Sequence, residues 1–157
     1  MSGTSQFVTL GAAEEIYAAP VEKVQEILEL RPISRLPNAP SNLLGMIDVR
    51  SEGIPVLDLR ATLGLPLSRD DENTRIVVLR FKADGRDLTL ALKTDRVFEV
   101  TVLDDDTLSP PPPTGRRWDS RVIAGIGRRN GAFVTVLDLD RLLSFADVDG
   151  QGAPLAN

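Results

Sequence analysis

The alternation of apolar and polar residues predicts short strands joined by tight turns. Residues 38–60 contain two apolar strands on either side of a turn over Ser51–Gly53. This pattern is typical of an antiparallel hairpin, with Gly53 supplying the positive φ that the turn requires. Asp84-Gly85 and Asn130-Gly131 predict two further hairpins.

The remaining pattern predicts a chain made almost entirely of strands. The nearly unbroken apolar run at 74–81 predicts a strand buried on both faces. Strand 24–28 is expected to point Val24 and either Ile27 or Leu28 inward, with a short helix as the alternative. Other strands are expected at 6–10, 15–19, 87–92, 96–103, 121–127 and 132–139, an extended crossing loop at 31–40, short helices at 59–65 and 139–145, and a loose tail at 147–157.

An internal repeat relates the two halves of the chain. Val56–Arg60 recurs as Val136–Asp140, an offset of 80 that also places Gly45 on Gly125, and residues 24–27 correspond to 97–100. Each half holds about five strands, a size at which a single core is marginal, and a small sheet avoids open edges by curling closed.

The repeat therefore predicts an all-β fold of two pseudo-symmetric five-stranded SH3-like β-barrels with short helices. We expect one domain over 1–157, with approximate halves at 6–67 and 74–146 and with exchange of strands between the halves left open. The join between the barrels is expected to be apolar, and the crevice beside it is the expected docking place for a partner.

The composition limits the side-chain chemistry that is available to this protein. The chain lacks Cys and His, which excludes disulfides, thiolate nucleophiles, Cys/His zinc sites and an imidazole base. A net charge of −5 with scattered basic residues disfavours nucleic-acid or membrane-surface binding. We expect a cytoplasmic protein, because it has neither a signal peptide nor an apolar run of the ~20 residues that cross a bilayer. Asp104–Asp106 is interpreted as a solvated acidic loop, and no metal, cofactor or catalytic residue is expected.

Three segments together resemble the CheW family of chemotaxis coupling proteins. They are VEKVQEI at 21–27, LPNAPSNLLG at 36–45 and RSEGIPVLDLR at 50–60, and the resemblance extends over about 6–145. It implies two pseudo-symmetric barrels and a non-catalytic adaptor. The adaptor would bridge the cytoplasmic tip of methyl-accepting chemoreceptors to the regulatory domain of a CheA-type histidine kinase, in receptor arrays at the inner face of the membrane.

The resemblance also implies site residues. Those for receptor binding are Val24, Glu26 and Arg50, and those for kinase binding are Asn38, Leu43 and Met46. The chain departs from the family in reading Asp48-Val49-Arg50-Ser51 for Asn-Leu-Arg-Gly, where Asp48 is placed to pair with Arg50. Asn42 and Leu44 stand where an aromatic residue and Lys are common.

Structural interpretations compete with the functional ones. Arg50 and Glu26 could be ordinary solvent-facing charges, and the matching positions of Asp58 and Asp138 favour helix caps over a pair of catalytic carboxylates. Trp118 is interpreted as a lid over the second barrel rather than an interface anchor. The alternative functions are a ligand-sensing barrel module of a related phosphorelay and, less favoured, a carboxylate-based hydrolase.

Overall fold

The described residues fold into ten strands and a few very short helices. The computed structural model describes residues 5–83, 85–105, 107–110 and 122–142, so Trp118 and the expected tail at 147–157 lie outside the described residues. The strands are β1 (Phe7–Ala12), β2 (Glu15–Pro20), β3 (Val24–Glu29), β4 (Leu43–Val49), β5 (Glu52–Asp58), β6 (Arg75–Ala83), β7 (Arg86–Thr94), β8 (Arg96–Thr101), β9 (Ile123–Arg129) and β10 (Ala132–Leu137), with a 3-10 turn η1 (Val21–Lys23) and a helix α1 (Leu59–Thr62). The predicted all-β fold is confirmed, as is a strand rather than a helix at β3.

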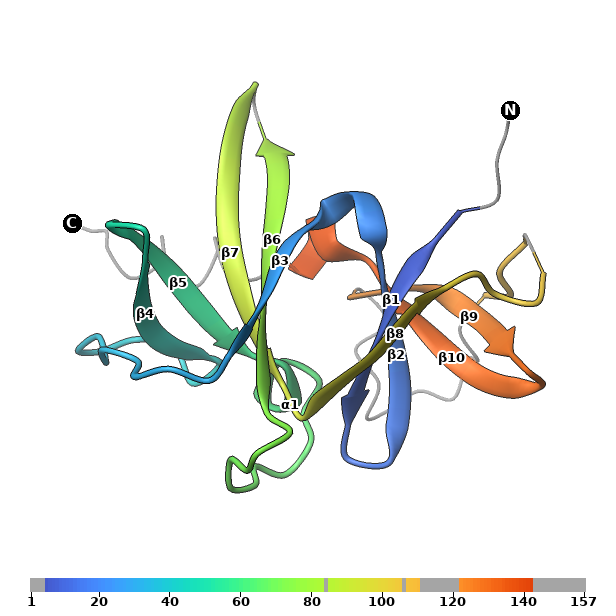
Figure 1. Cartoon of the computed structure of the whole chain (residues 1–157), viewed down its shortest axis with the longest axis horizontal. Coiled ribbons are helices and arrows are strands. Elements are labelled where there is room, and N and C mark those ends of the chain that lie inside the picture. The colour runs from blue at the N-terminus through green and yellow to red at the C-terminus, as the bar shows by residue number, and fades with distance from the viewer. Residues whose placement is uncertain (1–4, 84, 106, 111–121, 143–157) are drawn as a thin grey trace.

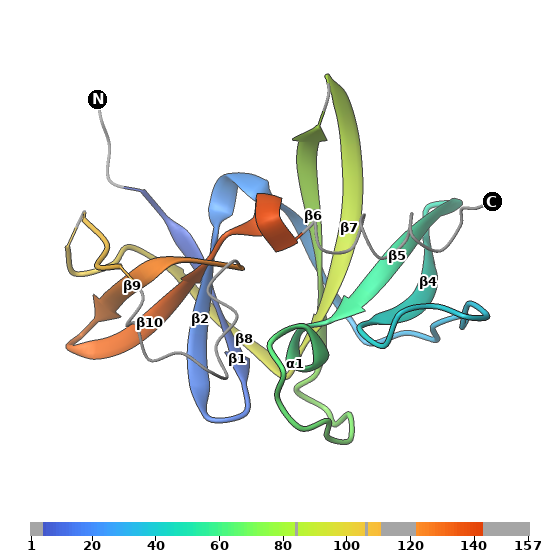
Figure 2. The ribbon, with the colours of Figure 1, turned by 180° about the vertical axis from the view of Figure 1, so that it is seen from behind.

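The strands form two five-stranded sheets of equivalent topology, which lie side by side with the β1–β2 and β6–β7 hairpins nearest the middle (Figures 1 and 2). The orders are β8-β1-β2-β10-β9 and β3-β6-β7-β5-β4. In each sheet one pairing is parallel, β2 with β10 and β5 with β7, and the others are antiparallel. Strands β1 to β5, the first sequence repeat, are therefore equivalent in position to strands β6 to β10, the second repeat.

The sheets do not follow the expected halves 6–67 and 74–146. The β1–β2 hairpin completes the sheet of β8, β9 and β10, while β6–β7 completes the sheet of β3, β4 and β5. Only Asp95 separates β7 from β8, and only η1 separates β2 from β3. At both links the chain passes from one sheet into the other instead of turning back, so the two repeats exchange their first hairpins.

Three apolar clusters form among the described residues, and the largest joins the two sheets. Its buried members come from both sheets and from the short helices: Val8, Leu10, Ala12, Tyr17, Ala19, Leu57, Leu59, Val77, Leu79, Leu90, Leu92, Leu137, Leu139 and Leu142. Each barrel encloses a smaller cluster, around Ile47 and Ile76 in one and around Val134 and Leu103 in the other. The predicted apolar join is confirmed, and β6 is buried on both faces because its alternate residues supply the join and one barrel interior.

The β4–β5 turn differs from the prediction. Its two residues are Arg50 and Ser51, with φ of 51° and 69°, while Gly53 pairs with Asp48 within the ladder. A two-residue turn of this kind needs positive φ at both positions to match the twist of the strands. The prediction that Gly53 supplies the positive φ is wrong, because the register closes the turn one pair earlier, between Val49 and Glu52.

The repeated glycines mark places where a loop crosses a strand. Ser34 and Met46 exchange two backbone hydrogen bonds of 2.8 Å, and Ser109 and Ile126 do the same in the other barrel. A Cβ at Gly45, whose φ is +152°, would lie 2.1 Å from the carbonyl oxygen of Ser34. The expected crossing loop therefore packs directly on β4, and only glycine permits that approach.

The repeated aspartates are helix caps, as predicted. The Asp58 carboxylate accepts a hydrogen bond from the Arg60 N–H at 3.0 Å, at the start of α1. The Asp138 carboxylate accepts one from the Arg141 N–H at 3.1 Å, at the start of the turn of helix at 139–142. Each carboxylate thus satisfies backbone donors that the helix itself leaves unpaired.

Candidate functional site

An ion pair joins two of the three residues expected at the receptor-binding site. Arg50 donates to both carboxylate oxygens of Glu26, through Nη1 at 3.3 Å and through Nη2 in the closer contact. Glu26 lies on β3 and Arg50 in the β4–β5 turn, so the pair spans the two edge strands of one sheet. The side chain of Glu26 is 24% exposed and that of Arg50 68% exposed, which places the pair at the surface.

The ion pair changes the pKa of Glu26. The hydrogen bond from Arg50 lowers the pKa of Glu26 below that of an ordinary glutamate, with a smaller contribution from the charge of Arg31. Arg50 pairs with Glu26 rather than with Asp48, whose carbonyl oxygen instead accepts a hydrogen bond from Arg31 at 3.2 Å. The guanidinium has five N–H donors, so the contact with Glu26 leaves others available to a partner.

The third residue, Val24, is positioned by an irregularity in β3. Val24 is opposite Leu79 and Glu26 is opposite Val78, with a register shift between them. Val24 packs on the cluster that joins the barrels, whereas Glu26 projects toward Arg50. Of the two candidates for the inward position, Leu28 packs on a barrel core and Ile27 is 41% exposed.

The opposite barrel carries a related pair. Glu99 lies on β8, at the position that corresponds to Glu26, and Arg129 at the end of β9 donates to it at 3.5 Å. This pair also spans the two edge strands of its sheet. Its arginine precedes the β9–β10 turn, whereas Arg50 lies within its turn at positive φ. In both barrels an ion pair thus joins the two edge strands. The arginine precedes the turn in one barrel and lies within the turn in the other.

The residues expected to bind a kinase lie on the crossing loop and on β4. Asn38 is exposed and has a φ of 57°. Leu43 is half-buried and packs on the cluster between the barrels, while Met46 is half-buried and is held by the backbone bonds to Ser34. Asn42 and Leu44, at which the chain departs from the family, also pack inward. Asn42 is buried, and Leu44 packs against a barrel core.

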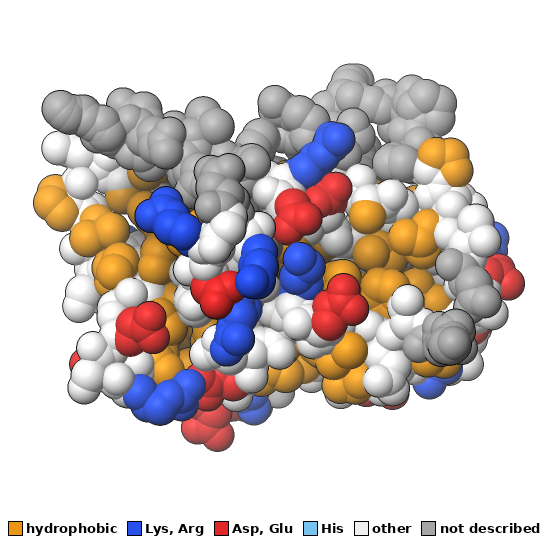
Figure 3. All heavy atoms as spheres, turned by 90° about the horizontal axis from the view of Figure 1, so that it is seen from above, with side chains coloured by type: hydrophobic (Ala, Val, Ile, Leu, Met, Phe, Trp, Pro, Cys, Tyr) orange, Lys and Arg blue, Asp and Glu red, His pale blue; other side chains and the backbone are white. Residues whose placement is uncertain are grey.

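Exposed apolar side chains form a second feature, which the sequence reasoning missed. Phe133 on β10 is 63% exposed, with the Arg128 guanidinium 4.3 Å from the centre of its ring. Phe98 and Val100 on β8 are 49% and 52% exposed. Figure 3 shows hydrophobic side chains exposed on both sides of a central group of acidic and basic side chains. Aromatic residues are enriched at protein-binding surfaces, so these side chains are candidates for such a surface.

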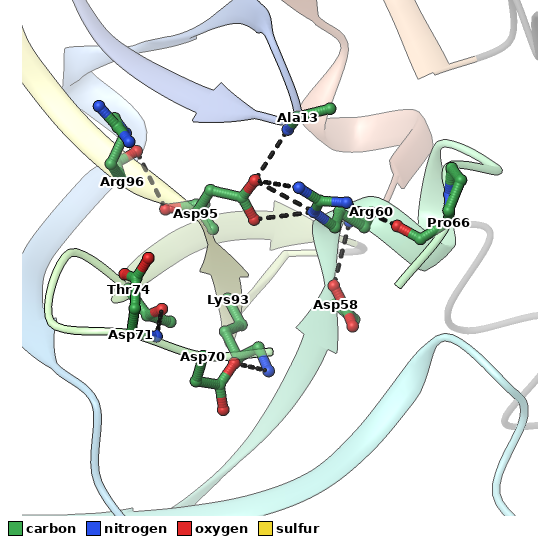
Figure 4. Close-up of polar contacts among 11 residues, drawn as sticks. Ala13, Asp58, Arg60, Pro66, Asp70, Asp71, Thr74, Lys93, Asp95 and Arg96 are labelled. Carbon is green, nitrogen blue, oxygen red and sulfur yellow. Dashed lines mark hydrogen bonds and ion pairs between the residues drawn. The ribbon is translucent and has the colours of Figure 1, made fainter. Parts of the chain in front are cut away.

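A polar contact fastens the join between the barrels (Figure 4). The carboxylate of Asp95, between β7 and β8, accepts hydrogen bonds from Arg60 at 2.7 and 3.0 Å and from the Ala13 N–H at 2.8 Å. Partial burial raises the pKa of Asp95, but the hydrogen bonds from Arg60 and Ala13 together outweigh that effect and hold the pKa below the ordinary range.

The acidic loop has a structural role at one of its residues. Asp104 accepts hydrogen bonds at 2.9 Å from the backbone N–H groups of Asn130 and Gly131, which lower its pKa. Asp106 lies outside the described residues. Within the described ranges, no three acidic side chains gather in a way that could hold a metal ion. The helices of those ranges are also all too short or too polar to cross a membrane.

The arrangement is that of a protein-binding module, with two barrels joined by an apolar cluster and with paired charges and apolar side chains displayed at the surface. A family model described as a CheW-like domain matches residues 6–147. The chain belongs to the CheW family, and is therefore a non-catalytic coupling adaptor of chemotaxis.

Individual relatives agree with this assignment. The chain is 28% identical to the chemotaxis protein CheW of Helicobacter pylori and 27% identical to that of Klebsiella aerogenes, each match covering 88% of this chain and 81% of the relative. Its fold matches the crystal structure of the scaffolding protein TtCheW from Thermoanaerobacter tengcongensis with a TM-score of 0.79. That match has 26% identity and covers 90% of this chain and 89% of the other.

Proposed function

We propose that this adaptor binds the cytoplasmic tip of a methyl-accepting chemoreceptor around Val24, Glu26 and Arg50. The observation that carries the proposal is the Glu26–Arg50 ion pair. The pair holds a guanidinium at the surface, in a turn whose positive φ is costly for any residue other than glycine. Positive φ is what a two-residue hairpin turn requires, and it fixes the direction in which the Arg50 side chain leaves the backbone. The remaining donors of Arg50 suit carbonyl or carboxylate groups on a receptor helix, and Val24 supplies an adjacent apolar contact.

The second partner in the proposal is the regulatory domain of a CheA-type histidine kinase, bound through Asn38, Leu43 and Met46. The support is that these residues share the crossing loop and the edge strand β4, whereas Glu26 lies on the opposite edge strand β3. An adaptor that binds both proteins couples their conformational equilibria, typically by ~1–3 kcal/mol. Each contact can be weak, because an array at the inner face of the membrane raises the effective concentration of every component.

Co-purification tests the proposal. A receptor cytoplasmic fragment and a kinase regulatory domain are each presented to the adaptor, and we expect both to be retained. Arg50→Ala and Glu26→Lys should lose the receptor fragment while keeping the kinase domain. Arg129→Ala and Glu99→Lys are matched controls, because they break the related pair of the other barrel. Equal loss from the control variants, or retention of neither partner by the unaltered protein, would overturn the proposal.

A further inference from the structure

A groove of about 460 Å³ lies beside β4, outside the residues assigned above. It is formed by the start of the crossing loop, by β4 and by the end of β7. Its lining residues are Leu30, Arg31, Pro32, Ile33, Arg35, Leu44, Asp70 and Lys93. The volume is within the range of sites that hold a small ligand or a few side chains of a partner.

The floor of the groove is apolar and fixed. Ile33 and Leu44 are half-buried and pack against the interior cluster of the barrel. The backbone bonds between Ser34 and Met46 hold the crossing loop against β4. Leu30 adds an apolar side chain that is 37% exposed. An apolar group of a partner would therefore meet a preformed surface, with little cost in ordering the site.

The rim of the groove is basic. It carries Arg31, Arg35 and Lys93 against the single acidic residue Asp70, a local charge of +2 in a chain of net charge −5. Figure 4 shows Lys93 and Asp70 in contact. The distance between their charged atoms is 2.5 Å, and the Lys93 side chain is 17% exposed. An ammonium has three donors, so this contact leaves others for a second acceptor. Arg35 is exposed, and no ion pair is recorded for it among the described residues.

We propose that this groove takes an acidic segment bearing an apolar side chain from the kinase regulatory domain. The proposal rests on the proposed function and names the chemistry of one of its contacts. Charge favours the acidic occupant, because a basic rim on an acidic protein attracts carboxylates selectively. Position favours the kinase, because the groove shares the crossing loop with Asn38 and the strand β4 with Leu43 and Met46. The apolar side chain of the segment would rest on Ile33 and Leu44, with its carboxylates against Arg35 and Lys93.

Affinity measurements with the purified regulatory domain of the CheA-type kinase from the same organism test this proposal. Arg35→Glu should weaken binding about tenfold at low salt, since a charge-assisted contact is replaced by repulsion. The effect should shrink between about 0.05 M and about 0.5 M salt as the charges are screened. Leu30→Gln should weaken binding similarly at both salt concentrations. Arg86→Glu is the charge-matched control, because Arg86 is exposed at the opposite end of β7 from Lys93.

The possible outcomes distinguish failure of the groove proposal from failure of the proposed kinase binding. Kinase binding that is unaltered in both Arg35→Glu and Leu30→Gln would overturn the groove and leave the adaptor function intact. Equal weakening by Arg35→Glu and Arg86→Glu would show a general charge effect and would also overturn it. If the unaltered protein does not bind the kinase domain, both the kinase contact and the groove fail. Thermal unfolding of each variant checks that the fold is retained.

Discussion

Glu26 on β3 and Arg50 in the β4–β5 turn form a bidentate ion pair that connects the two edges of one curled sheet. Without the contact, each edge would present an isolated charge at this end of the barrel. The pair therefore has two roles that experiments can separate: it closes the barrel, and it holds the Arg50 guanidinium at the surface.

Exchanging the two charges separates these roles. Glu26→Arg combined with Arg50→Glu rebuilds an ion pair with its polarity reversed, so we expect the double variant to unfold at nearly the same denaturant concentration as the parent. Receptor binding should remain lost, because the surface now presents a carboxylate where the partner meets a guanidinium. Chemical denaturation and a receptor-fragment binding assay give the two readouts. Recovery of receptor binding in the double variant would show that the pair acts only as a structural tie.

Replacing Ser51 should stabilise the fold. Ser51 has a φ of 69°, a conformation in which a Cβ is unfavourable and glycine is not. We expect Ser51→Gly to raise the free energy of unfolding by about 1 kcal/mol, with receptor binding unchanged because Arg50 keeps its position. Urea denaturation measures the change. Gly53→Ala is the comparison, since Gly53 lies in the ladder; a larger gain there than at Ser51 would contradict our description of the turn.

Among the glycines of the described residues, Gly45 should tolerate a side chain least, because the crossing loop packs directly on it. A Cβ at Gly45 would lie 2.1 Å from the Ser34 carbonyl oxygen, whereas one at Gly125 would lie 2.9 Å from that of Ser109. We expect Gly45→Ala to cost about 4 kcal/mol and Gly125→Ala about 2 kcal/mol in stability. Gly85→Ala meets no atom within 4 Å and should cost about 1 kcal/mol, from its positive φ alone. Thermal unfolding should rank the three in this order.

The contact of Asp95 with Arg60 should make stability depend on pH. Asp95→Asn removes charge-assisted hydrogen bonds at the join, so we expect a loss of about 2 kcal/mol at neutral pH. Because the pKa of Asp95 in the folded protein is below its unfolded value, the stabilisation is complete above about pH 4 and is lost as the pH falls further. The difference between parent and variant should therefore shrink in acid.

Denaturation at a series of pH values measures this effect. Asp87→Asn is the matched control, since Asp87 contacts Lys82 at 3.9 Å with both side chains largely exposed. Such surface pairs contribute ~0–1 kcal/mol. A constant difference between Asp95→Asn and the parent across the acid range would contradict the assignment of the pKa.

The sequence repeat predicted more of the fold than the local pattern did. The offsets that align Gly45 with Gly125 and Asp58 with Asp138 correctly identified strands, crossing loops and caps that are equivalent in the two barrels. Local turn chemistry was less informative. Gly53 resembled a turn residue because glycine is permissive, yet the register placed the turn at Arg50 and Ser51, which carry no such signal.

The contacts within the candidate site were not predicted from the sequence. Val24, Glu26 and Arg50 were selected by family resemblance, and Asp48 appeared the natural partner of Arg50 because it is two residues away. Glu26 is far in sequence and became the partner only when the sheet curled and brought β3 to the β4–β5 turn. The exposed Phe133 gave no signal, because an alternating strand pattern does not reveal which of its faces is covered.

The sequence by itself determined most of the strands, the duplication and the apolar character of the join, because these follow from periodicity and composition along the chain. Only the tertiary structure decided which hairpin completes which sheet. At the links of one residue at Asp95 and three at η1 the chain passes from one sheet into the other, and hydrophobic burial pairs β1–β2 with β10 and β6–β7 with β5. Sequence separation carries no information about that exchange, since equivalent strands in a repeat offer nearly equivalent partners.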